Sequence, residues 1–229
     1  MYKKAIIHVH TRHSFDSFTK PSKIVDMAVK EGISLLCISD HDTIKGSVEA
    51  REYSAKHYPG ILEVPIGAEY FTDCGDVIAL NIREEIRSRN IMDFIAEVRQ
   101  QNGLILLPHP YKHHKRIEEF IKYCDAVEVF NGRCTAEENQ KAKDLAVKYG
   151  KHEYVASDAH FVGNCLDCIN IYSKEEAGNL LSVFSNIDIE KSSKARTKLR
   201  MIHKSQMIKG IKRRDINLLY KSFKDYIRS

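Results

Sequence analysis

Residues 5–11 read Ala5-Ile6-Ile7-His8-Val9-His10-Thr11, an apolar run that carries two histidines two positions apart. Isoleucine and valine favour a β-strand, and side chains two residues apart on a strand point to the same face. Ligands of one metal ion must also face the same way, whereas a buried strand seldom keeps two imidazoles on one face without a partner. The stretch therefore predicts the first strand of the fold and two ligands of a metal site.

The same unit, a short apolar strand followed by a helical pattern, recurs along the chain. The predicted strands cover 5–10, 35–39, 62–69, 76–82, 104–107, 126–130 and, as the last one, 154–157, and the predicted helices cover 21–31, 46–56, 90–101, 115–122 and 136–149. Asp73-Cys74-Gly75 indicates a hairpin between two of these strands. Continuous apolar strands spaced by helices predict a mainly parallel sheet covered on both faces, either open or closed into a barrel.

Polar side chains follow these strands at the same end each time. They are His8 with His10, Asp40 with His41, Glu69, His109, Asn131, and Asp158 with His160. Parallel α/β folds and barrels build their sites at the carboxyl ends of the strands, so we expect these residues to converge. Imidazole and carboxylate suit zinc, manganese or iron, and their number exceeds what one ion can use. Two or three divalent metal ions are therefore expected.

Composition excludes several other classes of protein. With 229 residues and 43% hydrophobic content, the chain can bury one sizeable core. Its longest uncharged apolar stretches, such as 33–39, are far shorter than the roughly 20 residues of a membrane span, and no secretory signal follows Lys3 and Lys4. Six cysteines in a chain with such a core predict reduced thiols and a cytoplasmic location.

Two other kinds of site are weaker interpretations of the sequence. Cys165 and Cys168 have the spacing of half a zinc site, but no second cysteine pair lies nearby. A Ser-His-Asp triad would use Ser14 or Ser157 as nucleophile, yet no glycine-flanked nucleophile elbow is present.

Five motifs, in this order and spacing, resemble the polymerase and histidinol phosphatase (PHP) domain family. They are His8-Val9-His10-Thr11, Ser39-Asp40-His41-Asp42, Gly67-Ala68-Glu69, Pro108-His109-Pro110 and Ser157-Asp158-Ala159-His160. The resemblance runs from about Lys4 to Phe161. It implies a distorted seven-stranded (β/α) barrel, a trinuclear metal centre and the hydrolysis of phosphoesters.

The resemblance also implies a ligand set. The first metal would be held by His8, His10, Glu69 and Asp158, the second by Glu69 as a bridge together with His109, and the third by Asp16, His41 and His160. Two positions depart from the family pattern. Asp16 comes one residue later than the usual aspartate, and Asp76 stands where many members have a histidine. A carboxylate at residue 76 favours harder ions such as manganese, unless Asp76 is only a turn residue.

The leading hypothesis is a metal-dependent phosphoesterase that acts on a small phosphomonoester or a short oligonucleotide through a metal-bound hydroxide. Arg12, His13, the segment 112–115 and Arg133 could assist by binding phosphate, and His13 or a water could protonate the leaving alcohol. Amide hydrolysis is a second class, but such barrels usually carry a bridging lysine at a strand end, and this sequence has none there. The third is a vestigial metal-binding module that engages nucleic acid or a protein partner.

Charge divides the chain into two regions. Residues 191–229 contain 13 Lys and Arg and 2 Asp and Glu. Residues 1–190 contain 23 Lys and Arg and 29 Asp and Glu. We therefore expect a metallo-phosphoesterase domain over 1–190 and a basic helical extension over 191–229. Apolar residues at near-helical spacing predict two amphipathic helices in the extension. Either they pack their apolar side on the body and leave the lysines in solvent, or the lysines bind a phosphate-rich partner.

Overall fold

The computed structural model describes residues 2–173 and 179–229. The strands are β1 (Tyr2–Val9), β2 (Leu35–Ile38), β3 (Gly67–Thr72), β4 (Gly75–Leu80), β5 (Leu104–Leu107), β6 (Ala126–Asn131), β7 (His152–Ala156), β8 (Cys168–Ser173) and β9 (Ser193–Lys194). The helices are α1 (Pro21–Lys30), α2 (Lys45–His57), α3 (Ile91–Gln100), α4 (Ile117–Phe120), α5 (Ala136–Tyr149), α6 (Leu180–Ser185), α7 (Leu199–Arg213) and α8 (Ile216–Arg228), with 3-10 turns η1 (Ile121–Tyr123) and η2 (Val162–Asn164).

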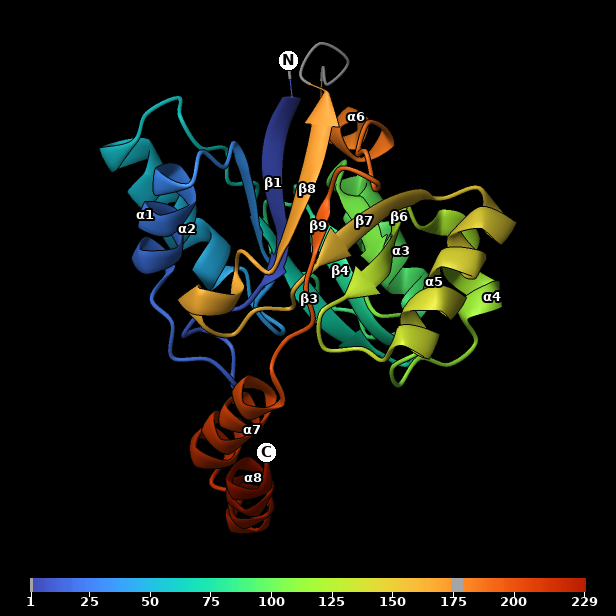
Figure 1. The fold of residues 1–229 in the computed structure, drawn as a ribbon. Helices are drawn as coiled ribbons and strands as arrows, with labels where there is room; N and C mark the ends of the chain where they lie inside the picture. The colour runs from blue at the N-terminus through green and yellow to red at the C-terminus, as the bar shows by residue number, and fades with distance from the viewer. Residues whose placement is uncertain (1, 174–178) are drawn as a thin grey trace.

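The strands form two mixed sheets, ordered β2-β1-β8-β9 and β3-β4-β5-β6-β7 (Figure 1). The predicted hairpin is confirmed, since Thr72 pairs with Gly75 across the turn. The prediction of a mainly parallel sheet is wrong. The hairpin makes β4 antiparallel to β3, and β4 also runs against β5, while β8 runs against β1. Among the named strands of the described residues, parallel pairing is limited to β1–β2, β5–β6 and β6–β7.

Strand β8 follows the strand that the sequence predicted to be the last. Its buried positions are Cys168, Asn170 and Tyr172, so a polar residue occupies the middle of the inward face. The Asn170 side-chain amide donates to the Val155 carbonyl at 2.7 Å and its oxygen accepts from the Val155 N–H at 2.8 Å. Asn170 thus links β8 of one sheet to β7 of the other. A buried amide needs such partners, and this pairing explains why the strand lacks an apolar pattern.

Isolated bridges also join the two sheets. Val9 pairs with Ala159, and His41 pairs with Glu69. Together with Asn170 they bring the edges of both sheets toward one centre. The described residues nevertheless form two sheets rather than one continuous ring of paired strands, so the closed seven-stranded barrel stays a prediction.

Strand β3 begins where the predicted strand was expected to end. The strand expected over 62–69 starts at Gly67, and Glu69 is its third residue. Upstream, only Glu63 pairs with a strand residue, Leu35, and Pro65 has no N–H to continue a ladder. Glu69 therefore lies inside a strand, and its bridge to His41 places it among the strand-end residues.

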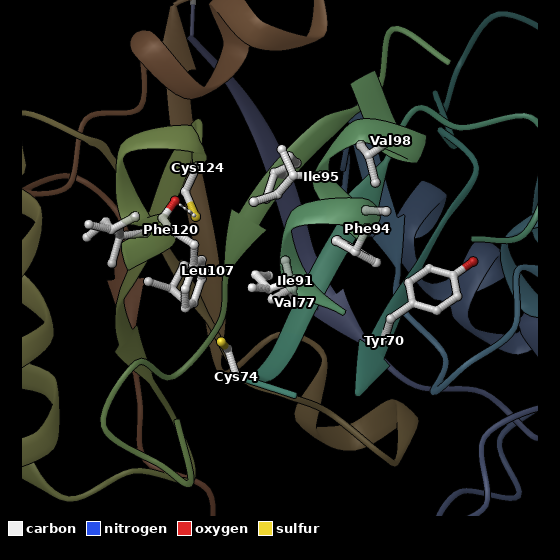
Figure 2. Packing of buried hydrophobic residues seen from close by; sticks show 14 of the residues in the cluster. Tyr70, Cys74, Val77, Ile91, Phe94, Ile95, Val98, Leu107, Phe120 and Cys124 are labelled. Atoms are coloured by element: carbon white, nitrogen blue, oxygen red, sulfur yellow. Dashed lines mark hydrogen bonds between the residues drawn. The ribbon is translucent and has the colours of Figure 1, made fainter. Parts of the chain in front are cut away.

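The largest apolar cluster lies between the β3–β7 sheet and the helices that cover it, α3, α4 and α5. Asn90 caps α3 by accepting hydrogen bonds from the N–H groups of Met92 and Asp93. Phe94, which is fully buried, packs edge-on against Tyr70 with ring centroids 5.5 Å apart. Figure 2 shows these rings with Val77 and Leu107 from the sheet. This packing fixes one face of the sheet whose strands β3 and β4 carry Glu69 and Asp76 and whose strand β5 leads to His109.

The basic extension forms the two predicted helices, α7 and α8, which pack against each other and reach beyond the sheets (Figure 1). The expectation that their apolar side packs on the body is wrong for α8. Ile216 is 79% exposed, and Phe223 and Ile227 are 52% and 63% exposed. Instead, basic and polar residues of α7 contact the body. No helix of the described residues is long and apolar enough to cross a membrane.

Candidate metal centre

All nine predicted metal ligands meet at one cavity of about 790 Å³. Seven of them line it: Asp16, His41, Glu69, Asp76, His109, Asp158 and His160. His8 and His10 lie deeper, at 0% and 1% exposure, against Glu69 and Asp158. The arrangement brings side chains from β1, β3, β4 and four loops into contact. Each ligand assignment derived from the resemblance is therefore spatially possible.

Three of these residues adopt backbone angles that are uncommon for side-chain-bearing residues. His8 has φ 63°, His109 φ 26° and Asp158 φ 51°. At His8 the β1–β2 register shifts between Ile7 and Val9, so the strand bulges at that residue. The His8 ring and the His10 ring, which follows the strand, still lie close, with ring centroids 5.2 Å apart. Such strain persists only where the surroundings impose it, and it is common at functional sites.

The first group of donor atoms surrounds the inner oxygen of Glu69. Glu69 Oε2 lies 3.4 Å from His8 Nε2 and 3.6 Å from His10 Nε2, and Asp158 Oδ1 lies 3.2 Å from His10 Nε2. Donor atoms that share one zinc ion at about 2.1 Å lie roughly 3 to 3.5 Å apart. The spacing of this group is close to that range.

The second group combines side chains from both strands of the β3–β4 hairpin with one from the loop after β5. Its members are Glu69, Asp76 and His109, and His109 Nε2 lies 3.1 Å from Glu69 Oε1. Burial, followed by the negative charge of Glu69, raises the pKa of Asp76 to about 6. Asp76 is thus an inward-facing carboxyl group and not only a turn residue. The turn itself needs Gly75, whose φ is 118° and whose Cβ would meet the His114 ring.

The third group is built around Asp16. Asp16 Oδ2 lies 2.9 Å from His160 Nε2 and 3.3 Å from His41 Nε2. The loop that places Asp16 one residue later than expected therefore still delivers its carboxylate to both histidines. His10 also belongs to this group.

Hydrogen bonds on the far side of the rings orient the histidines. His8 Nδ1 lies 2.9 Å from Glu128 Oε1, and His10 Nδ1 lies 3.1 Å from Ser14 Oγ, which donates to Asp40 at 2.8 Å. If Nδ1 carries the proton in each case, Nε2 presents a lone pair to the centre, as a metal ligand must. Asp40 thus supports the site without lining it.

Glu128 was not among the predicted site residues. It accepts from the His109 main-chain N–H at 2.7 Å and from the Asn131 amide at 2.8 Å, besides its contact with His8. A lone carboxylate in the apolar run Ala126-Val127-Glu128-Val129-Phe130 was the signal that could have revealed it. Asn131, expected at a strand end, holds Glu128 and does not line the cavity.

Several buried donor and acceptor atoms at the centre have no hydrogen-bond partner within the described part of the chain. They are His8 Nε2, His10 Nε2, Asp16 Oδ1, Glu69 Oε2 and His109 Nδ1. Leaving a buried polar atom unpaired costs about 1–3 kcal/mol, so five in one place require an explanation. Divalent cations satisfy these lone pairs, and a mixed imidazole and carboxylate set suits them. The residues present therefore fit a multinuclear metal site.

Electrostatics keep the Glu69 and Asp158 carboxylates ionised. Burial alone would raise the pKa of Glu69, but the neighbouring His8 and His41 hold it well below its usual range. Burial also opposes ionisation of Asp158, yet Arg133 and His8 bring its pKa well below the ordinary value. Ionised oxygens are the form that binds a metal ion.

The predicted catalytic residues occupy different places. Arg133 lines the cavity, where its Nη1 lies 3.6 Å from Asp158 Oδ1. His13 is outside the cavity lining and its Nε2 lies 2.7 Å from Glu49. Arg12 also bonds Glu49, at 3.0 Å. This arrangement does not favour a role for His13 or Arg12 at the centre. Residues 112–115 all line the cavity.

The two weaker interpretations gain no support from the described residues. Ser14 Oγ is bonded within the buried His10–Asp40 network and is absent from the cavity lining, as is Ser157. Cys165 and Cys168 are buried. Among residues 2–173 and 179–229, neither cysteine belongs to a cluster of side chains that could hold a metal ion.

The family model described as PHP domain matches residues 7–152, more than half of the chain. The chain therefore belongs to the PHP domain family. Two proteins of Methanocaldococcus jannaschii are similar in sequence. Uncharacterized protein MJ0417 is 32% identical over 200 residues, which cover 82% of this chain and 73% of that protein. Uncharacterized protein MJ1587 is 35% identical over 142 residues, which cover 56% of this chain and 81% of that protein.

Solved structures share the fold at low sequence identity. A two-domain protein from Bacteroides vulgatus, containing a predicted PHP-like metal-dependent phosphoesterase, aligns with a TM-score of 0.68 at 15% identity, covering 90% of this chain and 69% of that one. PsfC from Pseudomonas syringae aligns with a TM-score of 0.59 at 15% identity, and the alignment covers 92% of this chain and 98% of PsfC. An amidohydrolase from Chromobacterium violaceum aligns with a TM-score of 0.57 at 15% identity, and the alignment covers 68% of this chain and 87% of the amidohydrolase.

Proposed function

We propose that this protein is a metal-dependent phosphoesterase that hydrolyses a small phosphomonoester or a short oligonucleotide. The observation that carries the proposal is the convergence of nine imidazoles and carboxylates on one cavity, with five of their buried atoms unpaired among the described residues. Membership of the PHP domain family supports the same class of chemistry. We also propose that the two sheets act as a distorted barrel around this centre, which the Val9–Ala159 and His41–Glu69 bridges support.

Two or three divalent ions, manganese, zinc or iron, would be held by the three groups of ligands. When bound, such ions activate water as a nucleophile and neutralise charge that develops on phosphoryl oxygens. The chain's own part is to fix the ligands. Glu128 fixes His8, and the Ser14–Asp40 pair fixes His10.

Arg133 is the residue we propose to hold the reacting phosphate. Its guanidinium lies beside Asp158 and His160 at the wall of the cavity, and its Nη2 donates to Ser205 Oγ at 3.0 Å. A guanidinium offers paired N–H donors that match two phosphoryl oxygens. The group that protonates the leaving alcohol is proposed to be a water, since His13 is bonded to Glu49 outside the cavity.

The proposal is tested by metal analysis together with substrate hydrolysis. Purified protein should contain at least two ions per chain after loading with manganese or zinc, and it should release phosphate from generic phosphomonoesters or cleave short oligonucleotides. The variant His109→Ala should lose both an ion and activity. His152→Ala, an exposed histidine at the start of β7, is the matched control.

Two results would contradict the proposal. The first is an absence of cleavage of phosphomonoesters, phosphodiesters and short RNA by the loaded wild-type protein, with His109→Ala behaving identically. The second is fewer than two bound ions per chain, which is the result expected of a vestigial binding module.

A further inference from the structure

Helix α7 lies outside the segment that the PHP family model matches, yet it forms part of the wall of the cavity. Gln206, Lys209 and Arg213 of this helix line the same cavity as the candidate metal ligands. They are spaced three and four residues apart, which places them on one face of a helix. The cavity is thus closed on one side by cations from the basic extension.

Two anchors hold α7 in this position. The Lys212 ammonium donates to the main-chain carbonyls of Arg12, Ser14 and Ser17 at 2.8, 2.6 and 2.6 Å. These carbonyls belong to the loop that carries Asp16. At the other anchor, Ser205 accepts the hydrogen bond from Arg133. An ammonium group has three donors, and all three are used here to fix the helix to the body.

Lys209 and Arg213 have no acidic partner within 4 Å among the described residues. Both instead contact the ring of Phe15, at 4.9 Å for the Lys209 ammonium and 3.9 Å for the Arg213 guanidinium. The Phe15 ring also stacks on the ring of His41, with ring centroids 4.4 Å apart. The two cations therefore lie one aromatic side chain away from the candidate ligands, in contrast to Arg133, which touches them.

The charges of the cavity make these cations available to a ligand. Of the carboxylates that line it, Asp42 is paired with Arg89 at 3.0 Å, and the other four are candidate metal ligands. Bound divalent ions would neutralise those four. The remaining positive groups, among them Lys209 and Arg213, then face a cavity whose 790 Å³ exceeds the space that one phosphate needs.

We propose that Lys209 and Arg213 bind a second phosphoryl group of the substrate, separate from the one that reacts beside Arg133. The inference rests on the proposed function and narrows its substrate class to phosphate esters that carry a second phosphoryl group. That group belongs either to a small bisphosphate or to a neighbouring nucleotide of a short oligonucleotide. The chemistry of recognition is the same in both cases.

The binding test uses probes whose P–C bonds a phosphoesterase does not cleave. Propane-1,3-bisphosphonate and propylphosphonate are titrated into the manganese-loaded full chain by calorimetry. The wild-type protein should bind the bisphosphonate more tightly, and Lys209→Gln/Arg213→Gln should weaken its binding about tenfold or more, with a smaller effect on propylphosphonate. Lys221→Gln/Lys224→Gln removes the same charge from exposed positions of α8 and is the matched control.

Circular dichroism establishes that each variant is folded, and Lys209→Arg, which keeps the charge, should retain binding. Equal affinity of the wild type for the two probes, or unchanged affinity of Lys209→Gln/Arg213→Gln for the bisphosphonate, would overturn the inference. These outcomes do not depend on hydrolysis, so failure of the proposed function and failure of this inference are distinguishable.

Hydrolysis then identifies the source of the second group. One arm compares glucose 1,6-bisphosphate with glucose 1-phosphate, and the other compares the dinucleotide pTpT with thymidine 5′-phosphate. In the arm that represents the natural source, the wild-type preference in kcat/KM should fall about tenfold in Lys209→Gln/Arg213→Gln. A preference in either arm that the variant fully retains would contradict the assignment of these two residues.

Discussion

The candidate metal centre and helix α7 line the same cavity, but the centre and the α7–α8 pair are held in place in different ways. The centre consists of side chains that are almost all buried, and His8 and His10 are each fixed by a hydrogen bond behind the ring. Both helices leave large apolar side chains exposed, such as Leu199 of α7 and Ile216 of α8, and α7 is anchored through Lys212 and Ser205. Changes in the centre should therefore affect metal binding and catalysis, and changes in the face of α7 that lines the cavity should affect substrate choice.

The largest effect is expected from Glu69→Gln. Glu69 contacts His8, His41 and His109 and belongs to two of the ligand groups. Loss of its negative oxygen should remove at least one ion per chain and lower phosphate release by about 10³-fold, because a bound ion supplies several kcal/mol of transition-state stabilisation. Elemental analysis and a phosphate assay measure both quantities. Glu84→Gln, on the exposed surface, should behave as wild type, and full metal content in Glu69→Gln would contradict the assignment.

A smaller loss is expected from Glu128→Gln, which leaves every candidate ligand in place. Glu128 orients His8 through Nδ1 and accepts from the His109 N–H. Removal of such a supporting carboxylate costs about 10- to 100-fold in metal affinity or activity. Titration with manganese, compared with Glu153→Gln on the neighbouring strand, measures the effect. If the two variants bind manganese equally well, Glu128 does not position His8.

Lys212→Met tests how firmly α7 is attached to the body. The change leaves three main-chain carbonyls without their charged donor, so α7 should separate from the Asp16 loop more often. Hydrogen exchange of residues 199–213 should become about tenfold faster, which corresponds to roughly one charged hydrogen bond. Lys204→Met on the same helix, which only approaches the Tyr226 ring, serves as control. Unchanged exchange would show that the Ser205 anchor suffices.

The smallest effect is expected from Phe223→Ser. Phe223 is 52% exposed on α8, so the free energy of unfolding should change by no more than about 0.5 kcal/mol. Phe94→Ala, within the cluster of Figure 2, should cost about 3–5 kcal/mol. Urea denaturation followed by circular dichroism compares the two. A loss of about 2 kcal/mol or more in Phe223→Ser would mean that this face of α8 is covered in solution.

Much of the local structure was predictable from the sequence. The helix predicted over 136–149 is confirmed as α5, where Thr135 and Glu138 form a capping box, and Pro21 begins α1 as expected. The positions of seven of the nine candidate ligands at the ends of apolar runs were also readable, whereas Asp16 and Asp76 were assigned from the family resemblance. These features depend on neighbours in sequence, namely caps, turns and side-chain alternation.

Other features were not predictable because they depend on contacts between distant segments. Strand β8 has Asn170 on its buried face, which is tolerated only because the main chain of Val155 satisfies the amide. The role of Glu128 depends on His8, which is 120 residues away in sequence. The mixed pairing of the sheets follows from β4 and β8, whose directions no single-strand pattern specifies.

The sequence by itself determined the chemistry of the centre, because imidazoles and carboxylates at the ends of apolar strands are a local pattern. It also determined that residues 191–229 are basic and contain two helices. Only the tertiary structure decided where those charges lie. Lys212 reaches the carbonyl of Ser17 across 195 residues of chain, and that long-range contact places Lys209 and Arg213 at the cavity and leaves Ile216 and Phe223 in solvent. Helical spacing specifies which residues share a face, but packing against a distant loop specifies which way that face points.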